Sequence, residues 1–204
     1  MSIDGRRALK NGKSKAITNE ESRALVHSFR AEFDAIIIGG NTLRRYNPLL
    51  TTRGSKNPEP LRVVFTKSWD LPTNSNLWDC NKAKTLVIYD SSTANESYLN
   101  RIPKSVEIEK VSSDNPELIS KILAKRGCNK VLWECGPRLA TAAIKSDCIQ
   151  EIITFIAPKI LGGEISMNPF GDFEFKEMNE IIKLSDSQFS LIGNDICVQS
   201  KIKT

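Results

Sequence analysis

The sequence is poor in histidine and has no paired cysteines, and both features limit the metal sites and catalytic sites that it can form. Its 204 residues include one histidine and five cysteines, scattered without a Cys-x-x-Cys pair. A structural zinc site needs such paired ligands, so we expect no metal. His27 lies among ordinary helix formers, and we expect a surface or core residue there rather than a catalytic base. Unpaired thiols fit a reducing, cytoplasmic environment.

Long hydrophobic runs are also absent. No window approaches the roughly 20 apolar residues of a membrane helix, and charge begins at Asp4, too early for a secretory signal. The 29 Lys and Arg exceed the 24 Asp and Glu by five, an excess too small and too dispersed for nucleic-acid binding. It does suit a small phosphorylated ligand. Without repeats, low-complexity segments or linkers, residues 1–204 are expected to form one domain.

Apolar runs of strand length alternate with helical segments along the chain. Strands are predicted near residues 34–40, 61–65, 85–89, 106–111, 130–133 and 152–157, and helices over 18–31, 115–126 and 136–145. The first helix opens with a capping box in which the Thr18 hydroxyl is the N-cap and Glu21 is the returning carboxylate. This alternation predicts an α/β fold with a mainly parallel sheet flanked by helices.

The last part of the chain has a different pattern. Two strand-like runs, near residues 183–185 and 195–199, flank the turn dipeptide Gly193-Asn194. They predict a closing antiparallel hairpin. Residues 51–60, rich in Gly, Ser, Asn and Pro, are expected to be a surface loop.

Two strand-to-loop junctions have the composition of ligand sites, because ligands of parallel sheets bind beyond the carboxyl ends of the strands. The glycines of Gly39–Thr42 allow close approach of the backbone to a ligand, although a tight loop would use the same residues. At 133–137, a buried strand passes through glycine into a helix start that suits a phosphate, without the Gly-x-Gly-x-x-Gly dinucleotide fingerprint. We expect Glu134 to face the ligand, and the alternative is a capping role.

Five segments, in order, resemble the reductase domain of riboflavin biosynthesis. They are Met1-Ser-Ile-Asp-Gly5; Gly12-Lys-Ser14 with Ile17-Thr18; Arg30-Ala31 leading to Gly39-Gly-Asn-Thr42 and Asn47-Pro-Leu-Leu-Thr51; Glu134-Cys-Gly-Pro137; and Ile156-Ala-Pro-Lys-Ile-Leu-Gly-Gly163. The last two are the most specific, and the match covers nearly the whole chain. Residues 44–48 and 65–72 are most similar to cyanobacterial and plant-plastid members.

The resemblance implies a dihydrofolate-reductase-like three-layer α/β/α fold and NADPH-dependent reduction of 5-amino-6-(5-phosphoribosylamino)uracil to its ribitylamino product. The substrate-binding residues implied are Ser14, Arg30, Leu50, Arg53 and Glu134, of which Glu134 is the catalytic candidate. The cofactor-binding residues implied are Ala16, Thr42, Tyr46, Lys67, Ser68, Gly136, Pro137, Arg138, Leu139, Ala140, Thr141 and Ala142. The arginines suit the ribose phosphate, and Lys67 with Ser68 suits the 2′-phosphate of NADPH.

The chain departs from the family pattern at three places. Ala16 stands where many bacterial members have Trp, and Tyr46 stands where Asp is common. Family members also carry a strand before Ser2, most of which is missing here. Two alternatives therefore stay open: a reductase of the same fold that acts on another pteridine-like substrate, and a catalytically inactive relative.

The resemblance also bears on partners and mechanism. The family is usually homodimeric, and a zinc-dependent deaminase module often fused to it is not found in residues 1–204. Either a separate deaminase acts in the pathway, or the substrate is the non-deaminated diaminopyrimidine. The imine formed when the ribosylamine opens accepts hydride more readily once protonated, and Glu134 is the nearest acid by sequence. The alternative is that Glu134 only orients the substrate.

Overall fold

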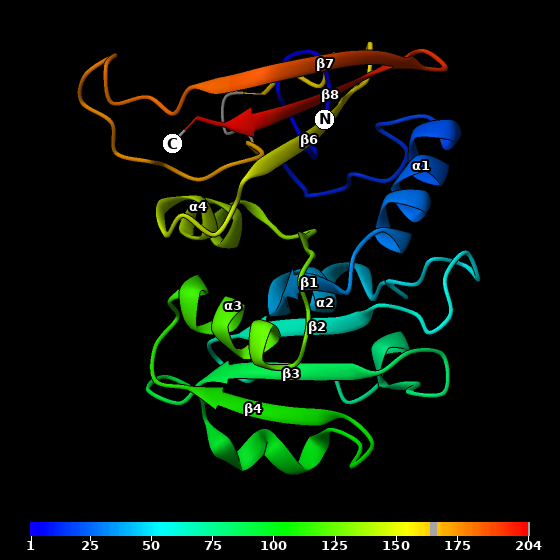
Figure 1. Cartoon of the computed structure of the whole chain (residues 1–204), viewed down its shortest axis with the longest axis vertical. Coiled ribbons are helices and arrows are strands. Elements are labelled where there is room, and N and C mark those ends of the chain that lie inside the picture. Colours follow the sequence, from blue (N-terminus) through cyan, green and yellow to red (C-terminus); the bar gives the residue numbers. More distant parts are fainter. Residues whose placement is uncertain (164–166, 204) are drawn as a thin grey trace.

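The computed structural model describes residues 1–163 and 167–203, which form two sheets with helices around them (Figure 1). The larger sheet has five parallel strands in the order β4-β3-β2-β1-β5. They are β1 (Ala35–Gly39), β2 (Leu61–Thr66), β3 (Thr85–Asp90), β4 (Glu107–Val111) and β5 (Val131–Trp133). The predicted parallel α/β architecture is confirmed.

The two covered faces of this sheet explain its continuous apolar strands. In β1, Ile36 and Ile38 pack into one hydrophobic cluster, whereas Ala35 and Ile37 pack into another. Successive side chains of a strand point to opposite faces, so a strand covered on both faces needs apolar residues throughout. All four side chains are fully buried, which fixes the position of the two glycines that follow them.

The described residues contain four α-helices: α1 (Glu20–Ala31), α2 (Gly40–Tyr46), α3 (Pro116–Lys125) and α4 (Pro137–Lys145). Two 3₁₀ helices, η1 (Asn76–Trp78) and η2 (Glu96–Arg101), lie in the connections. The three predicted helices are confirmed, but the predicted N-cap of the first is wrong. Asn19, not Thr18, accepts the hydrogen bond from Ser22 N (2.7 Å), and its side-chain amide also donates to Ile192 O across the fold. That second bond is tertiary, so the local capping pattern could not reveal it.

Residues 40–46 correct a second expectation. The Gly39-Gly40-Asn41-Thr42 segment was expected to be a loop, but it begins α2 immediately after β1. A Cβ atom on Gly40 would lie 3.1 Å from both Leu71 Cδ2 and Thr66 Oγ1. Gly40 therefore serves close packing at the start of a helix rather than a turn.

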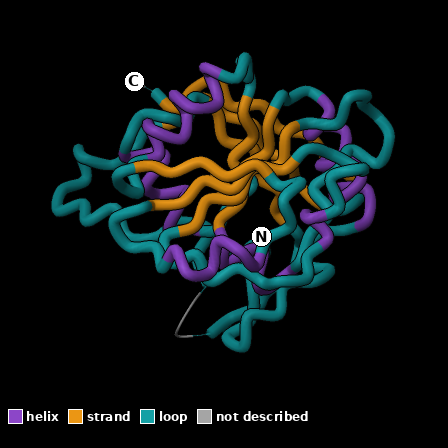
Figure 2. Tube along the Cα trace, turned by 90° about the horizontal axis from the view of Figure 1, so that it is seen from below, coloured by secondary structure: helices purple, strands orange, loops and turns teal. Residues whose placement is uncertain are grey.

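The second sheet consists of β6 (Glu151–Ile156), β8 (Asp195–Ile202) and β7 (Leu184–Ile192), in the spatial order β6-β8-β7. The hairpin predicted around Gly193-Asn194 is confirmed, with Gly193 at φ 58°. The expectation that residues 152–157 join the parallel strands is wrong, because this run, as β6, pairs antiparallel with β8. Figure 2 shows the strands of both sheets gathered centrally, with helices and loops around them.

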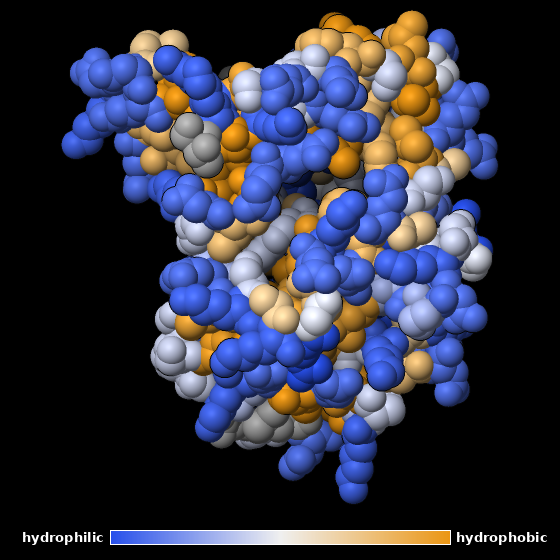
Figure 3. Space-filling model, viewed as in Figure 1, coloured by the Kyte–Doolittle hydropathy of each residue, from blue (hydrophilic) through white to orange (hydrophobic). Residues whose placement is uncertain are grey.

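A groove of about 700 Å³ runs between the two sheets, lined by residues of β5, β6 and α4 among others. The surface is hollowed between the upper and lower halves of the molecule in Figure 3. At one end of the groove, Ser2 forms a parallel bridge with Ala157, and the Met1 ammonium donates to Phe155 O (2.5 Å). The first residues thus lie along the edge of β6 in a strand-like pairing.

The thiols and the helices show two further properties of the fold. All five cysteines are free, and Cys197 is the one that is buried. Among residues 1–163 and 167–203, no helix combines the length and the hydrophobicity that crossing a bilayer requires.

Candidate functional site

The carboxyl ends of β1 and β5 bring two glycine-led helix starts together. The two strands are adjacent and parallel, with Ile37 opposite Trp133. Gly39 is the N-cap of α2 and Gly136 is the N-cap of α4, and neither makes a side-chain capping bond. A Cβ atom on Gly136 would lie 3.9 Å from Thr42 Oγ1. The first-turn N–H groups of two neighbouring helices are therefore left without a side-chain cap, as at an anion site.

The predicted cofactor residues of α2 and α4 lie around this junction. The Leu139 side chain lies 3.8 Å from the Cβ position of Gly39, and Arg138 is exposed. Thr141 differs from its neighbours, because it is buried and its hydroxyl accepts a hydrogen bond from Gly171 N (2.8 Å). Its side chain therefore helps to attach the segment around Gly171 to α4.

Lys67 and Ser68 follow β2, on the other side of β1, at the same edge of the sheet. The Lys67 ammonium pairs with Asp114 Oδ2 at 2.6 Å, and Thr93 Oγ1 donates to Lys67 O (2.9 Å). The two charged side chains are 57% and 54% exposed, so the pair contributes little stability and leaves Lys67 available to a phosphate. The predicted 2′-phosphate residues thus lie along the edge that carries the two helix starts.

Arg30 and Glu134 form a bidentate ion pair next to the α4 helix start. Arg30 Nε donates to Glu134 Oε2 (2.9 Å), and Arg30 Nη2 donates to Oε1 (2.7 Å). The arginine is 8% exposed, and its Nη1 also donates to Thr51 O (3.1 Å). A carboxylate held by two guanidinium N–H groups is ionised and acts as an acceptor. The geometry of Glu134 therefore favours a role in orienting a bound molecule over a role as a proton donor.

His27, expected to be a bystander, is part of this cluster. Its Nδ1 lies 3.1 Å from Arg30 Nη1 and 3.4 Å from Thr51 O. Burial, followed by the charges of Arg30 and Arg53, lowers the pKa of His27 below its usual 6.5. The i,i+3 spacing of His27 and Arg30 on one helix was the sequence signal for this contact.

The lowered pKa of His27 predicts an acid-sensitive fold. The unfolded chain takes up a proton near pH 6.5 but the folded protein only at lower pH, so the unfolding free energy should fall as the pH drops below about 6.5. His27→Asn keeps an acceptor near the Nδ1 position but cannot titrate. Urea unfolding at about pH 7.5 and about pH 5.5 should show a loss in the wild type that the variant lacks. Equal losses in both proteins would contradict this assignment.

The predicted substrate residues Leu50 and Arg53 lie on the segment that contacts this cluster. Leu50 is 1% exposed, and Arg53 is exposed. Both have left-handed backbone conformations, with φ 51° and 57°. Among the ion pairs of the described residues, Arg30 is bound to Glu134 whereas Arg53 has no carboxylate partner. Arg53 is therefore the arginine of this cluster whose guanidinium is open to an incoming anion.

Ser14, Ala16 and Tyr46 lie together in a different place. They line an open pocket of about 720 Å³ whose charged lining residues are Lys13, Lys15, Arg45 and Lys159. Ser14 Oγ donates to the Tyr46 hydroxyl (3.1 Å), so the residue that replaces the family's Asp holds the predicted substrate serine. Tyr46 ends α2 and Thr42 lies near its start, so this short helix connects the basic pocket with the junction of helix starts.

Two segments that are distant along the chain, around Asp4 and around Lys159, hold the lining of this pocket in place. Lys159 Nζ donates to Ala16 O (2.9 Å) and Ile17 O (2.7 Å). The Asp4 carboxylate accepts from Leu161 N (3.1 Å) and Gly162 N (2.8 Å). The hydrogen bond from the Ser2 hydroxyl is the main cause that lowers the pKa of Asp4 to about 2. Residues far apart in the sequence thus hold the pocket lining through side-chain bonds to backbone.

The model of the RibD C-terminal domain family matches residues 1–198. This chain belongs to that family. The riboflavin biosynthesis protein RibD of Synechocystis is 40% identical over 96% of this chain and 53% of its own length. The chloroplastic riboflavin biosynthesis protein PYRR of Arabidopsis thaliana is 36% identical over 97% of this chain and 33% of its own length. The RibD-family chain described here therefore spans about half or less of these relatives.

Solved structures show that the RibD-type fold is shared. RibD of Acinetobacter baumannii superposes with a TM-score of 0.83 at 23% identity, over 100% of this chain and 56% of that chain. A diaminohydroxyphosphoribosylaminopyrimidine deaminase/5-amino-6-(5-phosphoribosylamino)uracil reductase of Thermotoga maritima gives 0.77 at 24% identity, over 99% and 54%. The resemblance predicted from the sequence motifs is confirmed by the family match.

Proposed function

We propose that this chain reduces the ribosyl group of 5-amino-6-(5-phosphoribosylamino)uracil to the ribitylamino group, with NADPH as the hydride donor. The observation that carries the proposal is the Arg30–Glu134 pair lying directly before the glycine-led helix start at Gly136. The uncapped helix start suits a phosphorylated cofactor, and the ion pair of buried Arg30 with the partly exposed Glu134 suits a polar pyrimidine. The Thermotoga relative is named for this reduction.

The junction of α2 and α4 fits the cofactor. A Cβ atom on Gly136 would already be in van der Waals contact with Thr42 Oγ1 (3.9 Å), so glycine keeps this helix start free of side-chain atoms, and the uncapped α4 helix start offers N–H donors to a pyrophosphate. Lys67 and Ser68, at the same edge, suit the 2′-phosphate that distinguishes NADPH. When bound, the cofactor supplies a hydride. We assign to its binding Ala16, Thr42, Tyr46, Lys67, Ser68 and residues 136–142.

We assign the substrate to the side of Arg30, with Arg53 and the backbone of Leu50, whose side chain is buried, as further contacts; Ser14 would contribute from the neighbouring basic pocket. Arg53 carries the free guanidinium and is proposed to bind the ribose phosphate. Glu134, ionised and held by Arg30, is proposed to orient the pyrimidine by accepting hydrogen bonds from its N–H groups. On this assignment, the proton that accompanies reduction comes from water or another acid.

The direct test is NADPH oxidation by the purified chain with the deaminated and the non-deaminated pyrimidine in parallel, followed by the loss of NADPH absorbance. Turnover of the deaminated substrate, lost in Arg53→Ala, supports the proposal. Turnover of the non-deaminated substrate alone would change the assigned substrate. Binding of NADPH without turnover of either would favour a different substrate, and no NADPH binding would favour an inactive relative.

Turnover of the deaminated pyrimidine requires a deaminase that acts first. We propose that a deaminase supplies this substrate, and that the reaction takes place in the cytoplasm, where free thiols persist. We also propose a homodimer. Phe189 and Leu191 of the edge strand β7 are 71% and 76% exposed, and Figure 3 shows hydrophobic surface at that end of the molecule. Light scattering that gives the mass of one chain at micromolar concentration would contradict the dimer.

We further propose that residues 1–204 act as one domain. Ser2 pairs in parallel with Ala157, and Met1 lines the groove between β5 and β6, so the first residues lie where the two sheets meet. Thermal unfolding should therefore give one cooperative transition; two separate transitions would contradict this.

A further inference from the structure

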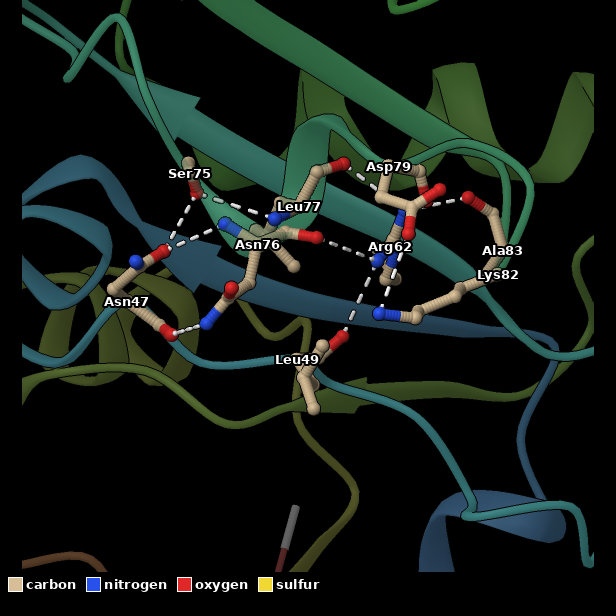
Figure 4. A network of polar contacts seen from close by, with 9 residues as sticks. All are labelled: Asn47, Leu49, Arg62, Ser75, Asn76, Leu77, Asp79, Lys82 and Ala83. Carbon is tan, nitrogen blue, oxygen red and sulfur yellow. Dashed lines mark hydrogen bonds and ion pairs between the residues drawn. The ribbon is translucent and has the colours of Figure 1, made fainter.

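Arg62 is a fully buried cation in the middle of the fold. It lies on β2, between apolar neighbours, with 0% exposure. Its guanidinium donates only to backbone carbonyls among the hydrogen bonds of the described residues: Leu49 (3.3 Å), Asn76 (3.4 Å), Leu77 (2.9 Å), Asp79 (2.9 Å) and Ala83 (2.5 Å). Figure 4 shows these carbonyls converging on it. Burial lowers the pKa of Arg62.

Burying the Arg62 guanidinium costs free energy, unless the backbone carbonyls around it need its N–H groups as hydrogen-bond donors. A buried guanidinium loses its hydration, and an apolar side chain would fill the same position without that cost. The carbonyls come from two segments outside the sheets, residues 47–50 and 75–83, of which the second contains the 3₁₀ helix η1. Arginine presents several N–H groups in a rigid planar fork, so one side chain can hold both segments against β2.

Asn47 completes the attachment of the first segment. Its Oδ1 accepts from Ser75 Oγ (2.9 Å) and Asn76 N (2.8 Å), and Asn76 Nδ2 donates to Asn47 O (2.7 Å). Figure 4 shows these bonds beside Arg62 and the carbonyls that it binds. Leu49, bound by Arg62, lies between Asn47 and the substrate-side residues.

The segment of residues 47–53, which Arg62 and Asn47 attach to the rest of the fold, has a strained backbone. Asn47, Leu50 and Arg53 have φ values of 40°, 51° and 57°, in the left-handed region that side chains other than glycine disfavour. Such conformations persist when the surrounding structure imposes them. At its far end the segment is fixed by Arg30 at Thr51 O, and by Glu59 at Thr52 N (2.7 Å).

We propose that Arg62 is a positioning residue for the substrate: by holding the Leu49 carbonyl, it maintains the strained conformation that presents Leu50 and Arg53. The inference rests on the proposed function for the role of Leu50 and Arg53. The inference adds Arg62 to the residues that shape the substrate site, as one that acts through the Leu49 carbonyl and not by contact with the substrate.

The test compares Arg62→Lys and Arg62→Met with a matched control. Lysine keeps the charge but reaches fewer carbonyls, and methionine keeps the length without a donor. The control is Arg126→Lys, a surface arginine paired with Glu107 and Glu109 on β4. For each protein we would measure KM and kcat with the deaminated pyrimidine, Kd for NADPH, Tm, and amide hydrogen exchange over residues 49–54.

Arg62→Lys should raise KM about tenfold and leave kcat and the NADPH Kd within about twofold, because the substrate contacts are displaced and the cofactor site is not. Exchange over 49–54 should accelerate, more in Arg62→Met than in Arg62→Lys, and the control should match the wild type. A lower Tm with unchanged KM and unchanged exchange would show a structural role only and overturn the inference.

Failure of the proposed function would be seen separately. If the wild type reduces neither pyrimidine, the exchange over 49–54 decides whether Arg62 holds the segment, while the inactivity of the wild type counts against the reductase assignment. If Arg62→Met does not fold, the lysine variant carries the comparison, because it retains a buried donor.

Discussion

Replacing Glu134 with glutamine is expected to lower kcat/KM for the pyrimidine about a hundredfold, with the NADPH Kd unchanged. Both carboxylate oxygens accept N–H groups from Arg30. In glutamine, one acceptor oxygen is replaced by an NH₂ donor that faces a donor of Arg30. The buried guanidinium therefore loses one of its two hydrogen bonds to residue 134, and the substrate loses an anionic acceptor. Steady-state kinetics and a cofactor titration by nicotinamide fluorescence measure the two effects.

The matched control for Glu134→Gln is Glu107→Gln. Glu107 also pairs with an arginine, Arg126, but at the surface of β4, where the carboxylate is 48% exposed. Its replacement should change neither kinetics nor cofactor binding, since exposed pairs contribute little. Unchanged turnover and unchanged substrate affinity in Glu134→Gln would remove Glu134 from the mechanism.

Replacing Gly136 with valine is expected to weaken NADPH binding about a hundredfold, or ~2.7 kcal/mol, while Tm stays close to that of the wild type. The backbone at Gly136 (φ −77°, ψ 169°) is accessible to any residue, so the fold can accept the change. The added Cβ would lie 3.9 Å from Thr42 Oγ1, and the two methyl groups would fill the space at the α4 helix start. Loss of that space should block close approach of a phosphate.

The Gly136→Val prediction is checked by NADPH titration and thermal unfolding. Ala124→Val, the same type of enlargement on the exposed side of α3, serves as the control and should leave NADPH binding unchanged. An unchanged Kd in Gly136→Val would move the cofactor away from the α4 helix start. It would leave the assignment of Arg30 and Glu134 to the substrate untouched.

Much of the fold was predictable because it depends on local pattern. Continuous β-branched runs predicted the strands, since a strand covered on both faces needs apolar residues at every position. Pro116 and Pro137 marked helix starts, and Gly193-Asn194 marked the hairpin, because these residues have preferred backbone geometries that act locally. The motif order identified the family, and the family match confirmed it.

What depends on distant partners could not be predicted from the sequence. The apolar pattern of residues 152–156 is the same in a parallel and an antiparallel pair, so only the pairing with β8 decided that β6 belongs to the second sheet. His27 lies 3.4 Å from Thr51 O, 24 residues away, and Arg62 binds carbonyls up to 21 residues away, so neither environment follows from local pattern. The sequence alone thus determined the family and most of the elements, although not α2, because local preferences encode them. The tertiary structure alone decided which charges are paired, which are buried and which remain open to a ligand, because those properties arise from contacts between segments distant along the chain.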